Sequence, residues 1–208
     1  SNLTVAGKKV ALTQSTGYPY CGDINIKVDR NSCGQFDLKI RIPGWLKSRP
    51  LPGELYSYSD NKRLGYSIKV NGVEAEGTVT EDGYFTIPRK WKKGDEVTIH
   101  FDMEPRTVRA SEKVEADRGM VSIERGPIVY CAEWPDNKFD IKSVLINQNP
   151  EFTLEQRSLD AFIPEASKAK LNTYKTQNIT TLTTDAQTLA FDKQGKLTTE
   201  AVKLTLIP

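Results

Sequence analysis

Residues 24–42 read INIKVDRNSCGQFDLKIRI and alternate apolar with polar side chains. The apolar residues recur at every second position from Ile24 to Val28 and again from Phe36 to Ile42. A period of two is typical of a β-strand that has one face in the core and the other in water. The polar residues 31–34 fall between the two runs, so this stretch predicts an antiparallel hairpin.

Similar strands continue after a long loop over residues 46–64 that is rich in Pro, Gly, Tyr and Ser. The run from Tyr66 to Val70 is followed by Asn71-Gly72, a pair that suits the two positive φ values of a type I′ hairpin turn. Turn signals at this spacing favour a β-sandwich over residues 1–111. Further short strands are expected at 84–87 and 97–101.

A second lobe over residues 112–208 follows a polar stretch near residue 110. The only expected helix covers residues 158–171, and Pro164 interrupts it. The chain is therefore predicted to be all-β, with two consecutive antiparallel β-sandwich lobes, 1–111 and 112–208, and at most one short helix. The strands expected in the second lobe are at 120–123, 128–131, 141–146, within 179–191 and at 202–206.

Lys and Arg number 29 against 27 Asp and Glu, and these charges are spread along the chain. No basic patch or acidic tail favours nucleic acid or an anionic membrane surface as a partner. No apolar run approaches the ~20 residues that span a bilayer. Ser1 opens directly into strand-like sequence without a signal peptide, which predicts a segment of a longer protein and leaves its localisation open.

Residue types that carry catalysis are sparse. His100 is the only histidine, and its place between Ile99 and Phe101 predicts a surface side chain on the wet face of a strand. No ligand spacing suits a metal and no glycine-rich loop suits a phosphate, so neither a metal nor a cofactor is expected. Cys131 follows the apolar run from Ile128 and is expected to be buried. The acidic residues fall at turns or outward positions, so no glycosidase pair of carboxylates stands out.

Aromatic side chains offer another kind of site, because a flat ring can stack on a sugar. Trp45 follows a strand end and Trp91 precedes a turn, so core packing is the better interpretation for both. Tyr56 and Tyr58 lie in the long loop and are the pair expected to be most exposed. They are the candidate carbohydrate-binding residues, with packing inside the loop as the simpler alternative.

Two arginines flank the strand expected at 120–124. Arg118 and Arg125 lie near Glu115, Asp117 and Glu124. These side chains are candidates for docking a neighbouring domain. The alternative is a local ion-pair cluster that contributes little to stability.

Several short motifs follow one another within residues 13–133. They are TGYPYCG at 16–22, LKIRIPGW at 38–45, VNG at 70–72, GYFTI at 83–87, WKKGD at 91–95, VEADRG at 114–119 and ERGPIVYC at 124–131. Their order and spacing resemble the C-terminal sandwich region of glycoside hydrolase family 127, the β-L-arabinofuranosidase-like proteins.

The resemblance implies that catalysis belongs to another part of the protein. Members of that family carry an (α/α)₆ barrel ahead of these sandwiches, and their zinc-bound cysteine nucleophile and glutamate acid/base lie in that barrel. The resemblance therefore implies that this chain carries no catalytic residue and that Cys131 is not the nucleophile. It also implies a periplasmic or extracellular parent protein.

The function predicted from these observations is structural support of a catalytic domain. The two lobes would brace the catalytic barrel of the same polypeptide, in an enzyme acting on arabinose-containing glycans. They could also take part in a homodimer, and the sequence leaves that question open. The alternative is a carbohydrate-binding module that takes a glycan through its loop aromatics. An autonomous enzyme is the third hypothesis and has the least support, because the catalytic residue types do not cluster.

Overall fold

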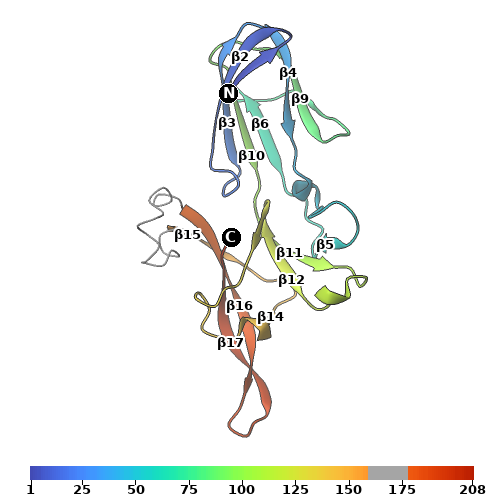
Figure 1. The fold of residues 1–208 in the computed structure, drawn as a ribbon, viewed down its shortest axis with the longest axis vertical. Coiled ribbons are helices and arrows are strands. Elements are labelled where there is room, and N and C mark those ends of the chain that lie inside the picture. Colours follow the sequence, from blue (N-terminus) through green and yellow to red (C-terminus); the bar gives the residue numbers. More distant parts are fainter. Residues whose placement is uncertain (159–177) are drawn as a thin grey trace. The chain divides into compact units, whose positions relative to one another are not determined.

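The computed structural model describes residues 1–158 and 178–208 and confirms the all-β prediction. These residues form strands β1 to β17 and the short 3₁₀ helices η1 (Gly44–Lys47), η2 (Glu115–Asp117) and η3 (Ile141–Ser143) (Figure 1). The helix predicted at 158–171 falls, apart from Ser158, outside the described residues. Among the described helices, none has the length and apolar character needed to span a membrane.

The chain divides into two compact units, Ser1–Val121 and Ser122–Pro208. The predicted division after residue 111 stays a prediction. Each unit has its own apolar core.

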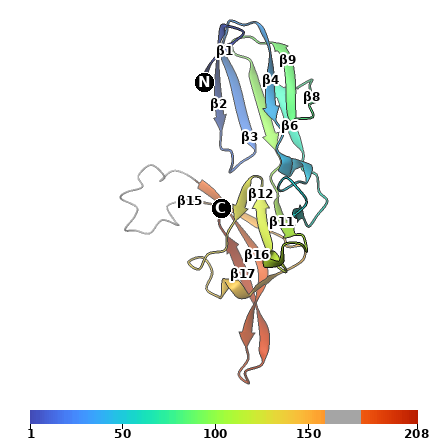
Figure 2. The same ribbon diagram turned by 45° about the vertical axis from the view of Figure 1, so that its right-hand side comes forward.

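The first unit contains two antiparallel sheets, which Figure 2 shows from the side. The larger sheet has the order β1-β2-β3-β10-β6-β7, and the smaller has the order β4-β9-β8. The strands of the larger sheet are β1 (Asn2–Val5), β2 (Lys8–Thr16), β3 (Asp23–Asn31), β10 (Glu96–Phe101), β6 (Tyr66–Val70) and β7 (Val73–Glu74). Those of the smaller sheet are β4 (Gln35–Arg41), β9 (Tyr84–Lys90) and β8 (Thr78–Val79).

The core of the first unit contains alternate residues from both sheets. Val28, Val97 and Ile99 come from the larger sheet, while Ile40 and Phe85 come from the smaller one. All five are buried in one cluster. Every second side chain of these strands therefore points into the core, as the period of two predicts.

The hairpin predicted over residues 24–42 is wrong in its pairing, although both strands are present. β3 pairs with β2 and β10, whereas β4 pairs with β9. Asn31 holds the connection, because its Oδ1 accepts the backbone N–H of Cys33 at 2.8 Å and its Nδ2 donates to the carbonyl of Trp91 at 2.8 Å. Alternation requires one buried face from each strand, and two facing sheets satisfy that requirement as well as one hairpin does.

The hairpin predicted at Asn71-Gly72 is confirmed. Val70 of β6 lies opposite Val73 of β7, which leaves a two-residue loop. Asn71 has φ 53° and Gly72 has φ 81°, the positive values that a type I′ turn needs.

The rest of the first unit includes the long loop and the strand pair β5 (Tyr56–Tyr58) and β11 (Pro105–Ala110). Tyr58 lies opposite Val108 in that pair, so the loop predicted over 46–64 contains a short strand. This strand ties the loop to the body of the unit.

The second unit is organised around one long strand, β16 (Asn178–Phe191). β17 (Leu197–Leu206) pairs along one edge of β16. β14 (Val144–Ile146) and β15 (Thr153–Ser158) pair with different segments of β16. β12 (Val121–Arg125) pairs with β13 (Ile128–Tyr130).

The core of this second unit is small. Leu182 is 0 % exposed and packs with Ile123, Tyr130, Leu204 and Leu206. The hydroxyl of Tyr130 donates to the carbonyl of Thr180 at 2.9 Å, so its buried polar atom is bonded.

We expect Leu182→Ala to lower the free energy of unfolding of the second unit by about 2–5 kcal/mol, because it leaves a cavity in a small core. Urea denaturation of the 208-residue chain measures the loss. Leu189→Ala in the same strand is the matched control, since Leu189 is 42 % exposed. Equal losses for the two variants would contradict the core described for this unit.

Candidate functional site

The long loop is held by a buried arginine that the sequence analysis did not single out. Arg106 of β11 is 3 % exposed, and its guanidinium lies 3.5 Å from the centre of the Tyr58 ring. Its Nη2 donates to Oδ1 of Asp60 at 2.5 Å, and its Nη1 donates to the carbonyl of Trp45 at 3.4 Å. Alternation along β11 is the one local signal for this residue, because it places Arg106 on the same side as the apolar Val108 and Arg109 on the other, where it is exposed.

Burial of the Asp60 carboxyl group would by itself raise its pKa. The hydrogen bond from Arg106 and the backbone N–H of Lys62 outweigh burial, so the pKa of Asp60 lies below its ordinary value. The ionised form is therefore the one that the folded chain stabilises.

The expected exposure of the tyrosine pair is wrong for Tyr58. Its ring is buried beneath Arg106, because β5 pairs with β11 and directs this side chain into the core. Tyr56 is half-buried, and its hydroxyl donates to Oδ2 of Asp117 at 2.9 Å. That hydrogen bond and the negative charge of Asp117 raise the pKa of Tyr56. Glycan binding by Tyr56 and Tyr58 stays a prediction.

The core assignments of two tryptophans are confirmed. Trp45 and Trp91 are buried, and Trp91 donates from Nε1 to the carbonyl of Phe36 at 3.0 Å. Trp45 packs edge-on against Phe101, with ring centres 6.2 Å apart. Both rings close the core of the first unit and are not available to stack on a ligand.

The two candidate docking arginines differ in their surroundings. Arg118 is exposed, and its Nε lies 3.7 Å from Oε2 of the exposed Glu112. Arg125 is half-buried in β12, where its backbone faces Ile128. A docking role for either arginine stays a prediction.

Cys131 is exposed, which corrects the prediction that it is buried. β13 directs Tyr130 into the core, so the following side chain points to the other side of the strand. Its backbone pairs with Ile207. Within residues 1–158 and 178–208, no three Cys, His, Asp or Glu side chains form a group that could hold a metal ion.

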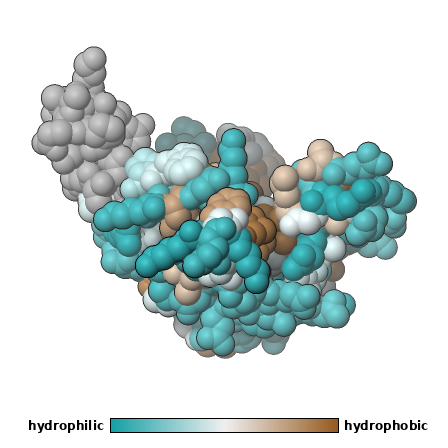
Figure 3. Space-filling model, turned by 90° about the horizontal axis from the view of Figure 1, so that it is seen from below, coloured by the Kyte–Doolittle hydropathy of each residue, from teal (hydrophilic) through white to brown (hydrophobic). Residues whose placement is uncertain are grey.

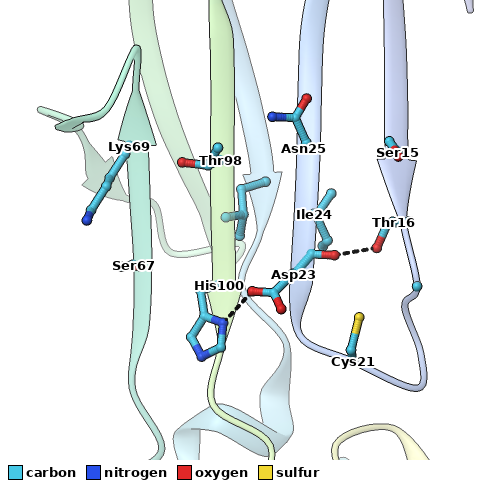
Figure 4. Close-up of a pocket in the computed structure, with 12 residues that line it drawn as sticks. Ser15, Thr16, Cys21, Asp23, Ile24, Asn25, Ser67, Lys69, Thr98 and His100 are labelled. Carbon is cyan, nitrogen blue, oxygen red and sulfur yellow. Dashed lines mark hydrogen bonds and ion pairs between the residues drawn. The ribbon is translucent and has the colours of Figure 1, made fainter.

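A groove of about 540 Å³ lies on the solvent face of the larger sheet (Figure 4). Two cross-strand rows of polar side chains line it. One row is Ser15, Asn25, Thr98 and Lys69, and the other is Asp23, His100 and Ser67. Directly opposite residues share a face of the sheet, so these side chains all point away from the core.

His100 lies in the second row and is exposed, as the sequence predicts. Its Nδ1 lies 2.7 Å from Oδ1 of Asp23, and its Nε2 lies 3.4 Å from Oδ1 of Asp102. The imidazole therefore joins β3 to the end of β10. Asp102 follows His100 by two residues, so alternation alone places it on the same side, whereas the position of Asp23 depends on the pairing of β3 with β10, which was not foreseen.

Comparison with known proteins identifies what these units are. Residues 1–103 match the model for the β-L-arabinofuranosidase GH127 middle domain, and residues 105–208 match the glycoside hydrolase family 127 C-terminal domain. A non-reducing end β-L-arabinofuranosidase of Bifidobacterium longum subsp. longum is 31 % identical over 146 residues, which cover 68 % of this chain and 19 % of that protein.

Two solved structures align with the whole chain. One is described as a GH127 β-arabinofuranosidase and has 49 % identity, a TM-score of 0.86 and 30 % of its own length covered. The other is a GH127 β-L-arabinofuranosidase from Geobacillus stearothermophilus T6, with 25 % identity, a TM-score of 0.74 and 29 % of its length covered.

The fold and these matches define a pair of β-domains of a glycoside hydrolase family. The chain belongs to glycoside hydrolase family 127 and comprises the middle and C-terminal domains of that family. It spans about a fifth of its curated relative and under a third of the two solved structures.

We expect Asp60→Asn to lower the free energy of unfolding by about 1.5–3 kcal/mol at pH 7, because it removes a hydrogen bond between charged partners. The folded pKa is lower than the unfolded one, so the carboxylate contributes stability above about pH 4 and loses it as pH falls through the folded pKa. The difference between wild type and variant should therefore shrink below pH 4. Urea denaturation between pH 7 and pH 3 measures it.

Asp37→Asn is the control, because Asp37 is exposed on β4. It should change stability by less than about 0.5 kcal/mol at any of these pH values. A difference for Asp60→Asn that stays constant across the series would show that the Asp60 charge does not stabilise the fold.

Proposed function

We propose that this chain is the support region of a longer enzyme that hydrolyses arabinose-containing glycans, and that it braces a catalytic domain of the same polypeptide. The observation that carries the proposal is the alignment of the whole chain with under a third of a GH127 β-arabinofuranosidase at a TM-score of 0.86. Domains of this family accompany a catalytic domain in one polypeptide. The other relatives described above are also named as β-L-arabinofuranosidases.

An exposed apolar surface on the second unit supports the bracing role. Phe191 and Leu197 lie directly opposite each other near the tip of the β16–β17 hairpin and are 73 % and 55 % exposed. Leu189 lies two residues before Phe191 on the same face. Leu145 of β14 is opposite Gln187 and shares that face as well. We call these four leucine and phenylalanine side chains the hairpin patch.

The hairpin patch is expected to be buried against another part of the protein. Figure 3 looks at the end of the molecule that carries the hairpin tip, and hydrophobic surface there lies beside hydrophilic surface. Contiguous exposed apolar surface typically marks an interaction site. The aligned solved structures are more than three times as long as this chain, so the remaining polypeptide supplies the occupant we assign.

The test compares the 208-residue chain with the longer protein. Phe191→Ser with Leu197→Ser should change the unfolding free energy of the isolated chain by less than about 1 kcal/mol, because both side chains are already exposed. The same pair should destabilise the longer protein by about 3 kcal/mol or more, since it would remove two buried apolar side chains from an interface. Calorimetry of both proteins measures the two effects.

Lys193→Ser at the hairpin tip is the matched control and should leave both proteins unchanged. An equal, small effect of the double variant on both proteins would contradict bracing through the hairpin patch. Release of arabinose by the 208-residue chain alone would contradict the assignment of catalysis to the rest of the polypeptide.

A further inference from the structure

The groove on the first unit has features that a merely solvated sheet face does not need. Its end wall is the loop from Gly17 to Cys21, which joins β2 to β3. Thr16 fixes this loop, because its Oγ1 donates to the carbonyl of Asp23 at 2.7 Å and accepts the N–H of Tyr18 at 2.9 Å. Gly17 leaves no room for a side chain, since a Cβ there would lie 2.8 Å from Sγ of Cys21. These contacts hold the start of the wall loop in one conformation.

The lining offers donors and acceptors at spacings set by the sheet. Asn25 supplies both an amide donor and an acceptor, Lys69 supplies an ammonium, and Asp23 supplies a carboxylate. Only Oδ1 of Asp23 is used by His100, and Oδ2 makes no hydrogen bond to another described residue. Neighbouring residues within a row belong to strands about 4.8 Å apart, and the two rows are two residues, or roughly 6.8 Å, apart along each strand. This arrangement suits a ligand that presents several hydroxyl groups.

The charges of the groove select a neutral ligand. Lys69 and Asp23 have opposite signs, so neither a phosphate nor a cation is favoured by the lining as a whole. The volume of about 540 Å³ lies within the range of small-ligand sites.

The wall loop also carries two aromatic residues. Tyr18 and Tyr20 are each 36 % exposed, and they lie outside the lining of the groove itself. An aromatic ring with one face accessible can pack on the C–H face of a sugar while its hydroxyl stays in water. Carbohydrates combine these two requirements, hydroxyl groups on their edges and apolar C–H faces.

We propose that this groove binds a neutral oligosaccharide, with Asn25 and Lys69 bonding its hydroxyl groups and the wall tyrosines contacting a sugar face. The choice of an arabinose-containing oligosaccharide as ligand rests on the proposed function. The site differs from the tyrosine pair of the long loop, whose second ring is buried under Arg106.

The test titrates the 208-residue chain with arabino-oligosaccharides and follows backbone amide shifts by NMR. We expect saturable shifts at β3, β6 and β10. Asn25→Ala and Lys69→Ala should each weaken binding about five- to tenfold, because each removes a hydrogen bond to the ligand. Lys27→Ala is the matched control, since Lys27 points to the same face of β3 but does not line the groove. It should bind like wild type.

Three outcomes would overturn the proposal: no saturable shift at tens of millimolar ligand, equal weakening by Lys27→Ala, or loss of binding through Tyr56→Ala with Asn25→Ala unaffected. Xylo-oligosaccharides are the second probe. Binding of this probe alone, with the same sensitivity to Asn25→Ala, supports the groove as a glycan site and counts against the arabinose-directed function. Circular dichroism verifies that each variant is folded.

Discussion

The side chains of Val28, Val97 and Ile99 lie on one face of the larger sheet, and those of Ile40 and Phe85 lie on the smaller sheet that shares their core. Burying one face of each sheet against the other is the constraint on which the rest of the first unit depends. Because side chains alternate along a strand, each buried residue leaves its neighbours on the outer face. The polar rows of the groove are a direct consequence, since Thr98 and His100 alternate with Val97 and Ile99 in β10.

The long loop obeys a different constraint. Its backbone is joined to β11 by the short strand β5 and by hydrogen bonds of the flanking Leu55 and Ser59, so most of the loop needs side-chain contacts to hold one conformation. Arg106 supplies them, because one guanidinium bonds Asp60, bonds the carbonyl of Trp45 and stacks on Tyr58. A planar guanidinium can make all three contacts at once, whereas a lysine ammonium offers no flat surface for the ring. The cation and the carboxylate are each compensated, as buried charges must be.

Sequence reasoning succeeded where the information is local. The turn at Asn71-Gly72 follows from two residues that accept positive φ, and the strands found as β3, β4, β6, β9 and β10 follow from the apolar pattern and the turn signals. Sequence reasoning failed where the structure depends on which strands pair with each other. Alternation says that β3 and β4 each have a buried face, but the same pattern fits a hairpin and two facing sheets. The burial of Tyr58 and the role of Arg106 both depend on the pairing of β5 with β11, which no local pattern in residues 46–64 or 105–110 specifies. Asp23, which lies beside His100, was missed for the same reason.

The two units expose surfaces of opposite chemistry, and this difference bears on what each surface can do. The hairpin patch offers apolar side chains, whose removal from water is favourable without any specific partner geometry. Such a surface stabilises an association but discriminates little between one apolar partner and another. The groove offers hydrogen-bonding groups fixed by the sheet register, and these would favour a ligand whose hydroxyl groups match their positions, because unmatched polar groups remain costly to desolvate. A support region that also bound glycan would need both kinds of surface. Placing them on separate units would let binding at one leave the packing at the other undisturbed.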